Sequence, residues 1–318
     1  MEKYDLEKND QQVHENAVKD WWNLSLNAKK WDGLTYNKEF ETHLHYWIRQ
    51  KKTLEFLDNL KLEKNSNILE LGFGGGETAE KILEKGFNYY GIDISDQLCS
   101  QATKKYSKYV ESGKAKFIAG SLEKDFPFKE NFFDLVIICG AIHYAGNLTK
   151  SFNEVKRVLK NNSYYIIGQG NMYTLNDLIV PRKFLKCLIW FFTKETFMHS
   201  YSLSYRDMIF ESKLAKFFLK YKDSKFMNSS FMTNKSNKWK YKIHKRLFSL
   251  SRLKKMVQKY NFKILRISGG PFLYNSENKT SIIKKYLNLI LQKILDTKIL
   301  PILILIADNI VILTKIKK

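Results

Sequence analysis

Short apolar runs alternate with amphipathic stretches through the middle of the chain. Apolar runs of strand length occupy residues 67–71, 89–93, 115–119, 133–139 and 164–168. Between these runs, apolar residues recur at helical spacing over residues 77–84, 96–110 and 148–159. Strands that alternate with helices at this spacing build right-handed crossover units around a parallel sheet. The pattern therefore predicts an α/β protein with a mainly parallel sheet.

The pattern differs on either side of this central part. Helical spacing predicts helices within residues 1–60, whereas residues 172–245 hold aromatic and basic stretches without regular alternation. Two further helical segments and two further strands follow, over residues 250–260, 282–306, 262–267 and 309–315. We predict an N-terminal helical cap, a central core, a helical insertion that forms a lid, and a C-terminal completion of the core, over residues 1–60, 61–171, 172–245 and 246–318.

Charge is distributed very unevenly along the chain. Its 318 residues include 54 basic and 32 acidic side chains, which gives a net charge of +22. Residues 172–318 hold 30 of the basic and only 8 of the acidic side chains, so this half carries the whole excess. A general drift in composition would have raised both halves. We therefore expect an anionic partner for the basic half, which an anionic membrane, a phosphorylated substrate or RNA could provide.

The cysteines and the apolar segments bear on the compartment. Cys99, Cys139 and Cys187 lie far apart and form no C-x-x-C pair, so neither a disulfide framework nor a sulfur-based metal site is predicted. The first residues are charged and show no secretory leader. The apolar run over residues 299–313 is shorter than the roughly 20 residues that a spanning helix needs. We expect a cytoplasmic protein, with peripheral contact at a membrane surface as a further option.

A glycine-rich loop follows the first predicted strand and precedes a predicted helix. Gly72, Gly74 and Gly76 would let the backbone approach a ligand closely, and the helix start offers free N–H groups. Asp93 ends the next strand, where a carboxylate can accept hydrogen bonds from both hydroxyls of a ribose. The loop and this acid together predict a nucleoside-type ligand.

The residues around the loop narrow the choice of ligand. Glu77 occupies the position of the third glycine in a dinucleotide-binding loop, and the G-K-[ST] of a P-loop is absent. An acid at Glu77 would repel a pyrophosphate, whereas Glu70 suits a positively charged end of the ligand. The ligand therefore has a ribose and cationic groups but no phosphate. S-adenosylmethionine meets these conditions.

Four ordered stretches of the chain resemble motifs of class I S-adenosylmethionine-dependent methyltransferases. They are Ile68-Leu-Glu-Leu-Gly-Phe-Gly-Gly-Gly76, Gly91-Ile-Asp-Ile-Ser95, Phe126-Pro-Phe with Phe133-Asp-Leu-Val-Ile, and Glu154-Val-Lys-Arg-Val-Leu159. The most similar branch methylates small molecules in ubiquinone and menaquinone biosynthesis. The resemblance covers residues 65–170 strongly and 244–315 loosely. It implies S-adenosylmethionine as cofactor and a doubly wound, Rossmann-like sheet of seven strands, mainly parallel, with the last strand antiparallel.

The resemblance also implies roles for the residues of the loop. Gly72, Gly74 and Gly76 would line the methionine part of the cofactor. Glu70 would orient its amino group, and Asp93 would bind the ribose hydroxyls. For Asp93, the structural alternative is a cap on a turn or helix.

Four further residues of the implied cofactor site lie after the second and fourth strands. Ile94 and Leu122 would pack on the adenine, and the Cys139 carbonyl would accept from the amino group. Ser121 stands where the family often has Asp, which weakens the implied adenine contact there. Core packing is the alternative role of Ile94, Leu122 and Cys139.

Histidines are the candidates for catalysis, because a hydroxyl acceptor usually needs a base with a pKa near neutrality. His143 follows the fourth strand, at the carboxyl edge of the sheet where ligands bind. It would act as base or substrate contact, unless it only bonds to a helix end. His244 is the second candidate, and His199 and Tyr36 are weaker ones.

The resemblance predicts an enzyme that methylates a small molecule, at a hydroxyl, with a lipid-linked or phosphorylated acceptor as options. Lysines alternate with bulky apolar residues over residues 183–192 and 213–222 of the insertion. These stretches could cover the substrate pocket, contact a membrane or stack on RNA bases. An RNA methyltransferase and a non-catalytic cofactor-binding subunit are the alternative functions. The acceptor and the oligomeric state remain open.

Overall fold

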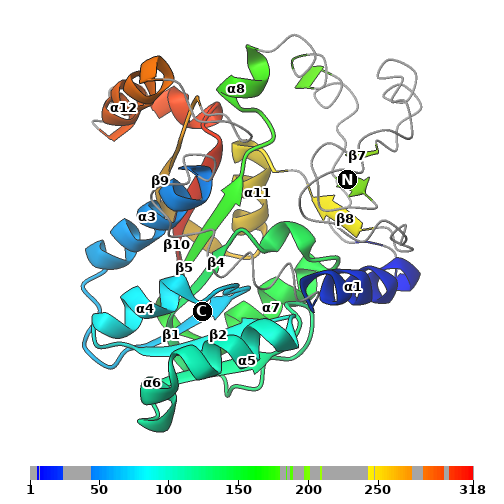
Figure 1. Cartoon of the computed structure of the whole chain (residues 1–318), viewed down its shortest axis with the longest axis vertical. Helices are drawn as coiled ribbons and strands as arrows, with labels where there is room; N and C mark the ends of the chain where they lie inside the picture. Colours follow the sequence, from blue (N-terminus) through cyan, green and yellow to red (C-terminus); the bar gives the residue numbers. More distant parts are fainter. Residues whose placement is uncertain are drawn as a thin grey trace.

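The computed structural model describes residues 6, 8–23, 44–179, 184, 187–188, 197–200, 208–209, 243–246, 248–273, 282–296 and 301–317. In these residues a central sheet is flanked by helices on both faces, and a second, small sheet lies beside it (Figure 1).

The central sheet has seven strands in the order β3-β2-β1-β4-β5-β10-β9. Their bounds are β1 (Asn67–Leu71), β2 (Asn88–Asp93), β3 (Ala115–Ala119), β4 (Phe133–Cys139), β5 (Leu159–Gly170), β9 (Phe262–Gly270) and β10 (Asn309–Ile316). Strands β1 to β5 pair in parallel, whereas β10 runs antiparallel to both β5 and β9. The predicted fold, a mainly parallel seven-stranded sheet with an antiparallel last strand, is therefore confirmed.

Each face of the sheet has its own hydrophobic core. One face is covered by α3 (Leu44–Asn59), α4 (Glu77–Glu84) and α5 (Asp96–Lys105), and the other by α7 (Leu148–Val158) and α11 (Leu250–Lys259). Alternate residues of a strand point to opposite faces, so β4 sends Leu135 and Ile137 into the first core and Val136 and Ile138 into the second. This two-sided burial explains the continuous apolar runs of the sequence.

The remaining described elements lie around this sandwich. They are α1 (Lys8–Asn23), α6 (Ser107–Glu111), the 3-10 turn η2 (Ile142–Tyr144), α8 (Leu175–Leu178), α12 (Ile282–Asp296) and the 3-10 turn η4 (Pro301–Leu305). The helix predicted over residues 96–110 is divided into α5 and α6 at Tyr106, whose backbone leaves helical angles. The Tyr106 hydroxyl donates a 2.8 Å hydrogen bond to the Gly76 carbonyl, which ties this break to the glycine loop.

The insertion differs from the predicted helical segment. Besides α8, its described part contains three short strands, β6 (Phe197–Ser200), β7 (Met208–Ile209) and β8 (Ile243–Arg246), in an antiparallel sheet. These strands are too short to produce an alternating pattern that stands out from their lysine-rich surroundings. Of the two stretches in which lysines alternate with bulky apolar residues, residues 213–222 and most of residues 183–192 lie outside the described residues. Strand β8 returns the chain to the core, where it packs beside η2 and α1.

No helix formed by the described residues has both the length and the apolar character that crossing a membrane requires.

Candidate active site

The glycine loop between β1 and α4 has a backbone that only glycine adopts freely. Gly72, Gly74 and Gly76 have φ angles of 69°, 58° and 76°, in the left-handed region. A Cβ atom on Gly72 would lie 2.3 Å from the Cβ of Ala141, so the loop also passes very close to the residues after β4. The loop therefore reaches the carboxyl edge of the sheet at its centre, between β1 and β4.

Asp93 holds this loop against the end of β2. One carboxylate oxygen accepts a 3.0 Å hydrogen bond from the Gly74 N–H, and the other accepts one of 3.0 Å from the Ser95 N–H. Burial raises the pKa of Asp93 to about 6, although these backbone donors act in the opposite direction. The predicted cap-like role is thus present, and the carboxylate retains further lone pairs for a ligand.

Glu70, on β1, is a buried acid beside the same loop. Its side chain accepts a 2.7 Å hydrogen bond from the Tyr89 hydroxyl, and only 2% of the residue is exposed. Burial raises the pKa of Glu70 to about 8, against the lowering effect of hydrogen bonds from Tyr89 and Thr78. A cation next to this carboxyl would favour its charged form.

A pocket of about 380 Å³, which includes space open to solvent, lies over Glu70 and the glycine loop. Its lining comes from α3, β1, α4 and the end of β4, namely Tyr46, Arg49, Gln50, Glu70, Gly72, Phe73, Glu77, Thr78 and Cys139. The pocket therefore combines a buried acid and a buried guanidinium with a strand-to-helix loop of glycines. Gln50 donates a 3.0 Å hydrogen bond to the Thr78 hydroxyl, which links α3 to α4 across it.

Arg49 reaches this pocket from the N-terminal helix α3. Its guanidinium donates a 3.2 Å hydrogen bond to Asn309 and lies 5.2 Å from the ring centre of Tyr46. Two glycines at strand ends make room for it, because a Cβ on Gly140 would lie 2.3 Å from its Nη2 and one on Gly168 would lie 3.1 Å from its Cγ. Glycine at these two positions therefore provides the space that the Arg49 guanidinium and its methylene chain occupy.

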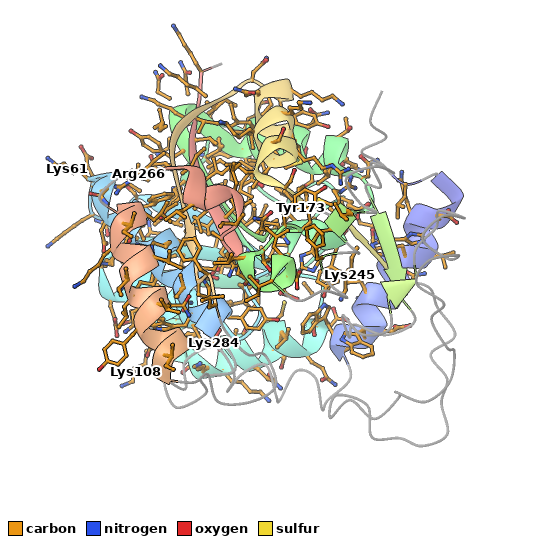
Figure 2. All side chains as sticks on the ribbon, turned by 90° about the horizontal axis from the view of Figure 1, so that it is seen from above. Lys61, Lys108, Tyr173, Lys245, Arg266 and Lys284 are labelled. Carbon is orange, nitrogen blue, oxygen red and sulfur yellow. The ribbon has the colours of Figure 1, made fainter. Side chains whose placement is uncertain are left out.

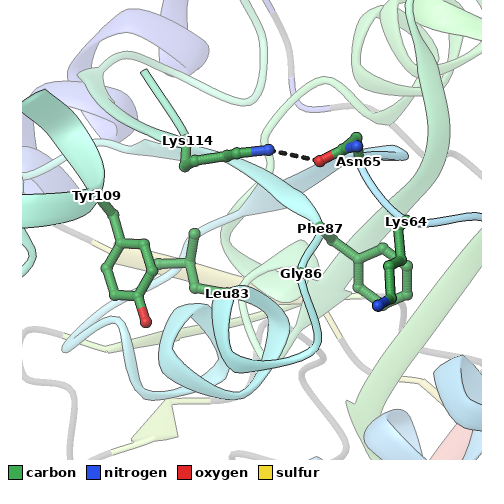
Figure 3. Close-up of a pocket in the computed structure, with 7 residues that line it drawn as sticks. All are labelled: Lys64, Asn65, Leu83, Gly86, Phe87, Tyr109 and Lys114. Carbon is green, nitrogen blue, oxygen red and sulfur yellow. Dashed lines mark hydrogen bonds between the residues drawn. The ribbon is translucent and has the colours of Figure 1, made fainter. Parts of the chain in front are cut away.

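A second, larger hollow of about 550 Å³ lies elsewhere on the molecule (Figure 3). Lys64 and Asn65 precede β1, Phe87 precedes β2 and Lys114 precedes β3, so this hollow lies at the amino ends of the strands. Ligands of open α/β sheets bind at the carboxyl ends. None of the predicted site residues lines the larger hollow, and we assign the ligand site to the smaller pocket.

Comparison with known proteins agrees with this geometry. Residues 69–167, from β1 to β5, match the family model of a methyltransferase domain. The chain carries a class I S-adenosylmethionine-dependent methyltransferase domain. The predicted resemblance is therefore confirmed, and S-adenosylmethionine is the cofactor of this domain.

Two relatives and one solved structure are similar to the methyltransferase domain. Sterol 4-C-methyltransferase strm-1 of Caenorhabditis elegans is 27% identical over 110 residues, which cover 35% of this chain and 33% of that protein. The ubiquinone/menaquinone biosynthesis C-methyltransferase UbiE of Rickettsia prowazekii is 34% identical over 102 residues, which cover 30% of this chain and 41% of that protein. The chain therefore spans less than half the length of each of these relatives.

The structural similarity extends further than the sequence similarity. The 1,6-didemethyltoxoflavin-N1-methyltransferase of Burkholderia thailandensis superimposes with a TM-score of 0.53 over 97% of this chain and 91% of that one. The sequence identity is only 8%, so this match shows the fold alone.

The methyltransferase domain places the predicted adenine residues near α1. Ile94 is partly buried against the α1 residues Ala17, Val18 and Trp21. Leu122 packs on the core between the sheet and helices α7 and α11. Ser121 donates a 3.1 Å hydrogen bond to Glu15 of α1. The sequence did not indicate that α1 borders this part of the site.

Cys139 and the two histidines lie at the carboxyl edge of the methyltransferase domain. The Cys139 thiol lies in the pocket, 3.8 Å from the Thr53 hydroxyl. His143, in η2, has its Nδ1 3.2 Å from the Gln169 side-chain amide. Burial, together with the smaller effects of the Lys245 and Arg49 charges, lowers the pKa of His143 to about 3.

His244, in β8, is linked to η2 through His14 of α1. The backbone N–H of His244 donates a 3.1 Å hydrogen bond to Nδ1 of His14, whose Nε2 lies 2.6 Å from the Tyr144 carbonyl oxygen. Because Nδ1 accepts, Nε2 must carry the proton and donate it. His199 pairs with His244 in register between β6 and β8, and Tyr36 lies outside the described residues.

Sequence reasoning missed the residues that reach the pocket from outside the glycine motif. They are Tyr46, Arg49, Gln50 and Thr78 in the pocket, with Gln169 beside His143. Two glycines at strand ends, Gly140 and Gly168, were the available signal, since they predict close approach of another group.

Proposed function

We propose that the chain transfers a methyl group from S-adenosylmethionine to a hydroxyl of a small-molecule acceptor. The single observation that supports it best is the pocket in which Glu70, Arg49 and the glycine loop lie together at the carboxyl edge. When bound, S-adenosylmethionine supplies the electrophilic methyl group. The family match over residues 69–167 supports the cofactor, while the acceptor is inferred from the chain's own residues.

The pocket suits the amino-acid end of the cofactor, which carries one positive and one negative group. Glu70 would hold the ammonium group, because a cation beside this buried carboxyl favours its charged form. Arg49 would hold the carboxylate with its donors. Gly72 and Gly74 would leave room for the part of the cofactor that carries these two groups. Asp93 would accept hydrogen bonds from the ribose hydroxyls with its remaining lone pairs. Ile94 and Leu122 would border the adenine, with Ser121 beside them.

The acceptor side would be built around His143. Its imidazole is neutral at physiological pH, because its pKa is lowered to about 3, and it can accept a hydrogen bond from a hydroxyl. An imidazole of such low basicity would orient the hydroxyl, and the proton that the hydroxyl loses on methylation would pass to water. Lys245, buried in β8, lies near His143, and burial lowers its pKa to about 7. An acceptor that is phosphorylated or otherwise anionic would favour the charged form of Lys245.

The partners of the chain belong to the same proposal. The acceptor is a small molecule. A lipid-linked acceptor is supported by the names of two relatives, a sterol 4-C-methyltransferase and a ubiquinone/menaquinone biosynthesis C-methyltransferase. Those names specify methylation at carbon, whereas His143 supports a hydroxyl. Identifying the atom that receives the methyl group therefore distinguishes methylation at carbon from methylation at a hydroxyl.

Cofactor binding provides the first test of the proposal. Replacing Asp93 with Ala should weaken S-adenosylmethionine binding by about 1.5–3 kcal/mol, since charge-assisted hydrogen bonds to the ribose are lost. Asp96→Ala is the matched control, because Asp96 is an exposed acid three residues away that pairs with Lys19. Calorimetric titration of both variants measures the difference, and equal affinities would refute the ribose assignment.

Transfer of a labelled methyl group provides the second test. Hydroxylated aromatic compounds, lipid-linked and phosphorylated acceptors, and RNA are offered in parallel, and the methylated atom of each product is identified by NMR. Transfer to a small-molecule oxygen supports the proposal. Transfer to carbon contradicts the hydroxyl, and salt-sensitive binding to RNA with methylation of it would favour the RNA alternative. Cofactor binding without any transfer would favour the non-catalytic alternative.

A further inference from the structure

The side of helix α12 that faces solvent is apolar, whereas an ordinary surface helix exposes its polar side. Its inward side includes Asn288, whose Oδ1 accepts hydrogen bonds of 2.8 Å and 2.7 Å from the backbone N–H groups of Phe272 and Leu273. Leu295 is buried on the same side. The inward side of the helix therefore combines a polar contact, from Asn288, with apolar packing of Leu291 and Leu295 on the core.

The outward side of α12 consists of large apolar residues. Ile283, Tyr286, Leu287, Leu289 and Ile290 are 73%, 65%, 42%, 59% and 53% exposed. Four of them follow the i, i+3, i+4, i+7 spacing of one helix face, with Leu289 beside it. We call these five residues the α12 face. Single exposed apolar residues are normal on a protein surface, but a continuous group on one helix marks an interaction site.

The charges of α12 indicate what this face contacts. The helix carries Lys284, Lys285 and Lys293, and it has no acidic residue before Asp296. It also belongs to residues 172–318, which carry the whole positive excess of the chain. Figure 2 shows α12 at the outer edge of the molecule, with Lys284 on it. Lysine is depleted in protein–protein interfaces, whereas apolar side chains flanked by lysines are typical of helices at anionic membrane surfaces.

We propose that the α12 face inserts into the interface of an anionic membrane, to which the net positive charge of residues 172–318 attracts it. A helix of 15 residues is about 22 Å long, so it can lie flat along the surface with its apolar side among the acyl chains. This surface is distinct from residues 183–192 and 213–222, the stretches of the insertion with a similar composition. The proposal does not depend on the acceptor of the methyl group.

Vesicle co-sedimentation of the full chain tests the proposal. The chain should bind vesicles of phosphatidylcholine mixed with phosphatidylglycerol and bind weakly to phosphatidylcholine alone, with binding reduced by salt. The double variant Ile283→Gln with Ile290→Gln should lower the partition coefficient at least about tenfold, because two deeply inserted apolar side chains are lost.

The matched control is Val13→Gln with Ile179→Gln. These two residues are 51% and 55% exposed and lie on α1 and just after α8, away from α12. This variant should bind vesicles like the unaltered chain. Thermal unfolding and S-adenosylmethionine titration check that both variants are folded.

Three results would overturn the proposal. The first is an unaltered chain that binds neither type of vesicle. The second is an α12 variant that binds as well as the control, particularly if Lys213→Gln, Lys216→Gln and Lys220→Gln together abolish binding, since the insertion would then be the contact. The third is a dimer, seen by light scattering, that the α12 variant converts to a monomer, because a second copy would then cover the face.

Discussion

Glu70 and Arg49 bring an acid and a guanidinium to one pocket, from strand β1 and helix α3. Both are buried, with 2% and 7% of each residue exposed. Isolated buried charges are costly, and the cost falls when a ligand supplies the opposite charge. The affinity for the cofactor should therefore depend on the protonation of Glu70 and on the positive charge of Arg49.

The pH dependence of cofactor binding follows from Glu70. Its pKa of about 8 means that the unliganded carboxyl is mostly protonated at neutral pH, and the cofactor ammonium should lower that pKa. Binding should then release a proton, and affinity should increase as pH rises from about 6 to 8. Glu70→Gln should bind more weakly and lose this dependence. Calorimetry in two buffers of different ionisation enthalpy counts the protons, and a value of zero would contradict the assignment.

The same shift predicts an opposite effect on the stability of the unliganded chain. A carboxyl whose pKa is raised from 4.5 to about 8 stabilises the fold below its unfolded pKa, and this contribution is lost as pH rises through the folded value. Cofactor should therefore protect the fold most at alkaline pH.

A matched substitution separates the contact that Arg49 makes with the cofactor from the general effect of removing one positive charge. Arg49→Gln should weaken S-adenosylmethionine binding by about 1.5–3 kcal/mol, because charge-assisted hydrogen bonds to the carboxylate are lost. Arg266→Gln is the control, since Arg266 also lies over an aromatic ring, that of Phe56, but outside the pocket. Titration calorimetry compares them. Similar affinities for the two variants would remove Arg49 from the cofactor site.

At the scale of elements, the glycine loop joins strand β1 to helix α4 and determines how closely a ligand can approach. Gly74→Ala should abolish measurable cofactor binding, because a side chain there would enter the part of the pocket that we propose for the methionine end of the cofactor. Gly86→Ala introduces the same backbone strain, since the φ of Gly86 is +84°, but its Cβ would meet nothing within 4 Å. Each variant should lose about 1–2 kcal/mol of stability. Equal cofactor affinity in the two variants would show that the loop is only a turn.

The elements that sequence predicts well are those whose pattern is local. Strand β4 is buried on both faces, so its continuous apolar run predicts it correctly, and α4 follows from Gly76 and its periodic residues. The break at Tyr106 is different, because its cause is a hydroxyl contact with Gly76, thirty residues away. Strands β6 to β8 are two to four residues long, which is too short for a periodic pattern.

The candidate site divides in the same way. Glu70 and the glycines lie in one motif and Asp93 in the next one, so all of them can be found by reading along the chain. Arg49 lies in α3, where its residue type is common on any exposed helix face. Its position in the pocket depends on packing against Gly140 and Gly168, which no single stretch of sequence contains.

At the scale of the whole molecule, His14 joins the N-terminal helix to two distant parts of the chain. Both ring nitrogens bond to backbone groups, at Tyr144 and His244, so the ring is neutral in the fold. Burial lowers the pKa of His14 from 6.5 to about 4. Below its unfolded pKa the unfolded chain binds the proton and the folded chain does not, so this contribution to stability is lost as pH falls from 6.5 toward 4.

The stability difference between the unaltered chain and His14→Gln should therefore shrink on acidification. We expect the difference to fall by about 1–3 kcal/mol between roughly pH 7 and pH 4.5. Urea unfolding at both pH values measures it. A constant difference would mean that His14 does not titrate differently in the folded and unfolded states.

The position of β10 in the sheet has a consequence for how the chain is made. Strand β10 lies between β5 and β9, and β5 therefore has a free edge until residues 309–316 have been synthesised. On the ribosome, residues 67–170 can form the parallel half of the sheet early. Until β10 is made, residues 164–170 of β5, which pair with it, are exposed on one side. A nascent chain stalled before β10 would present that edge to other chains.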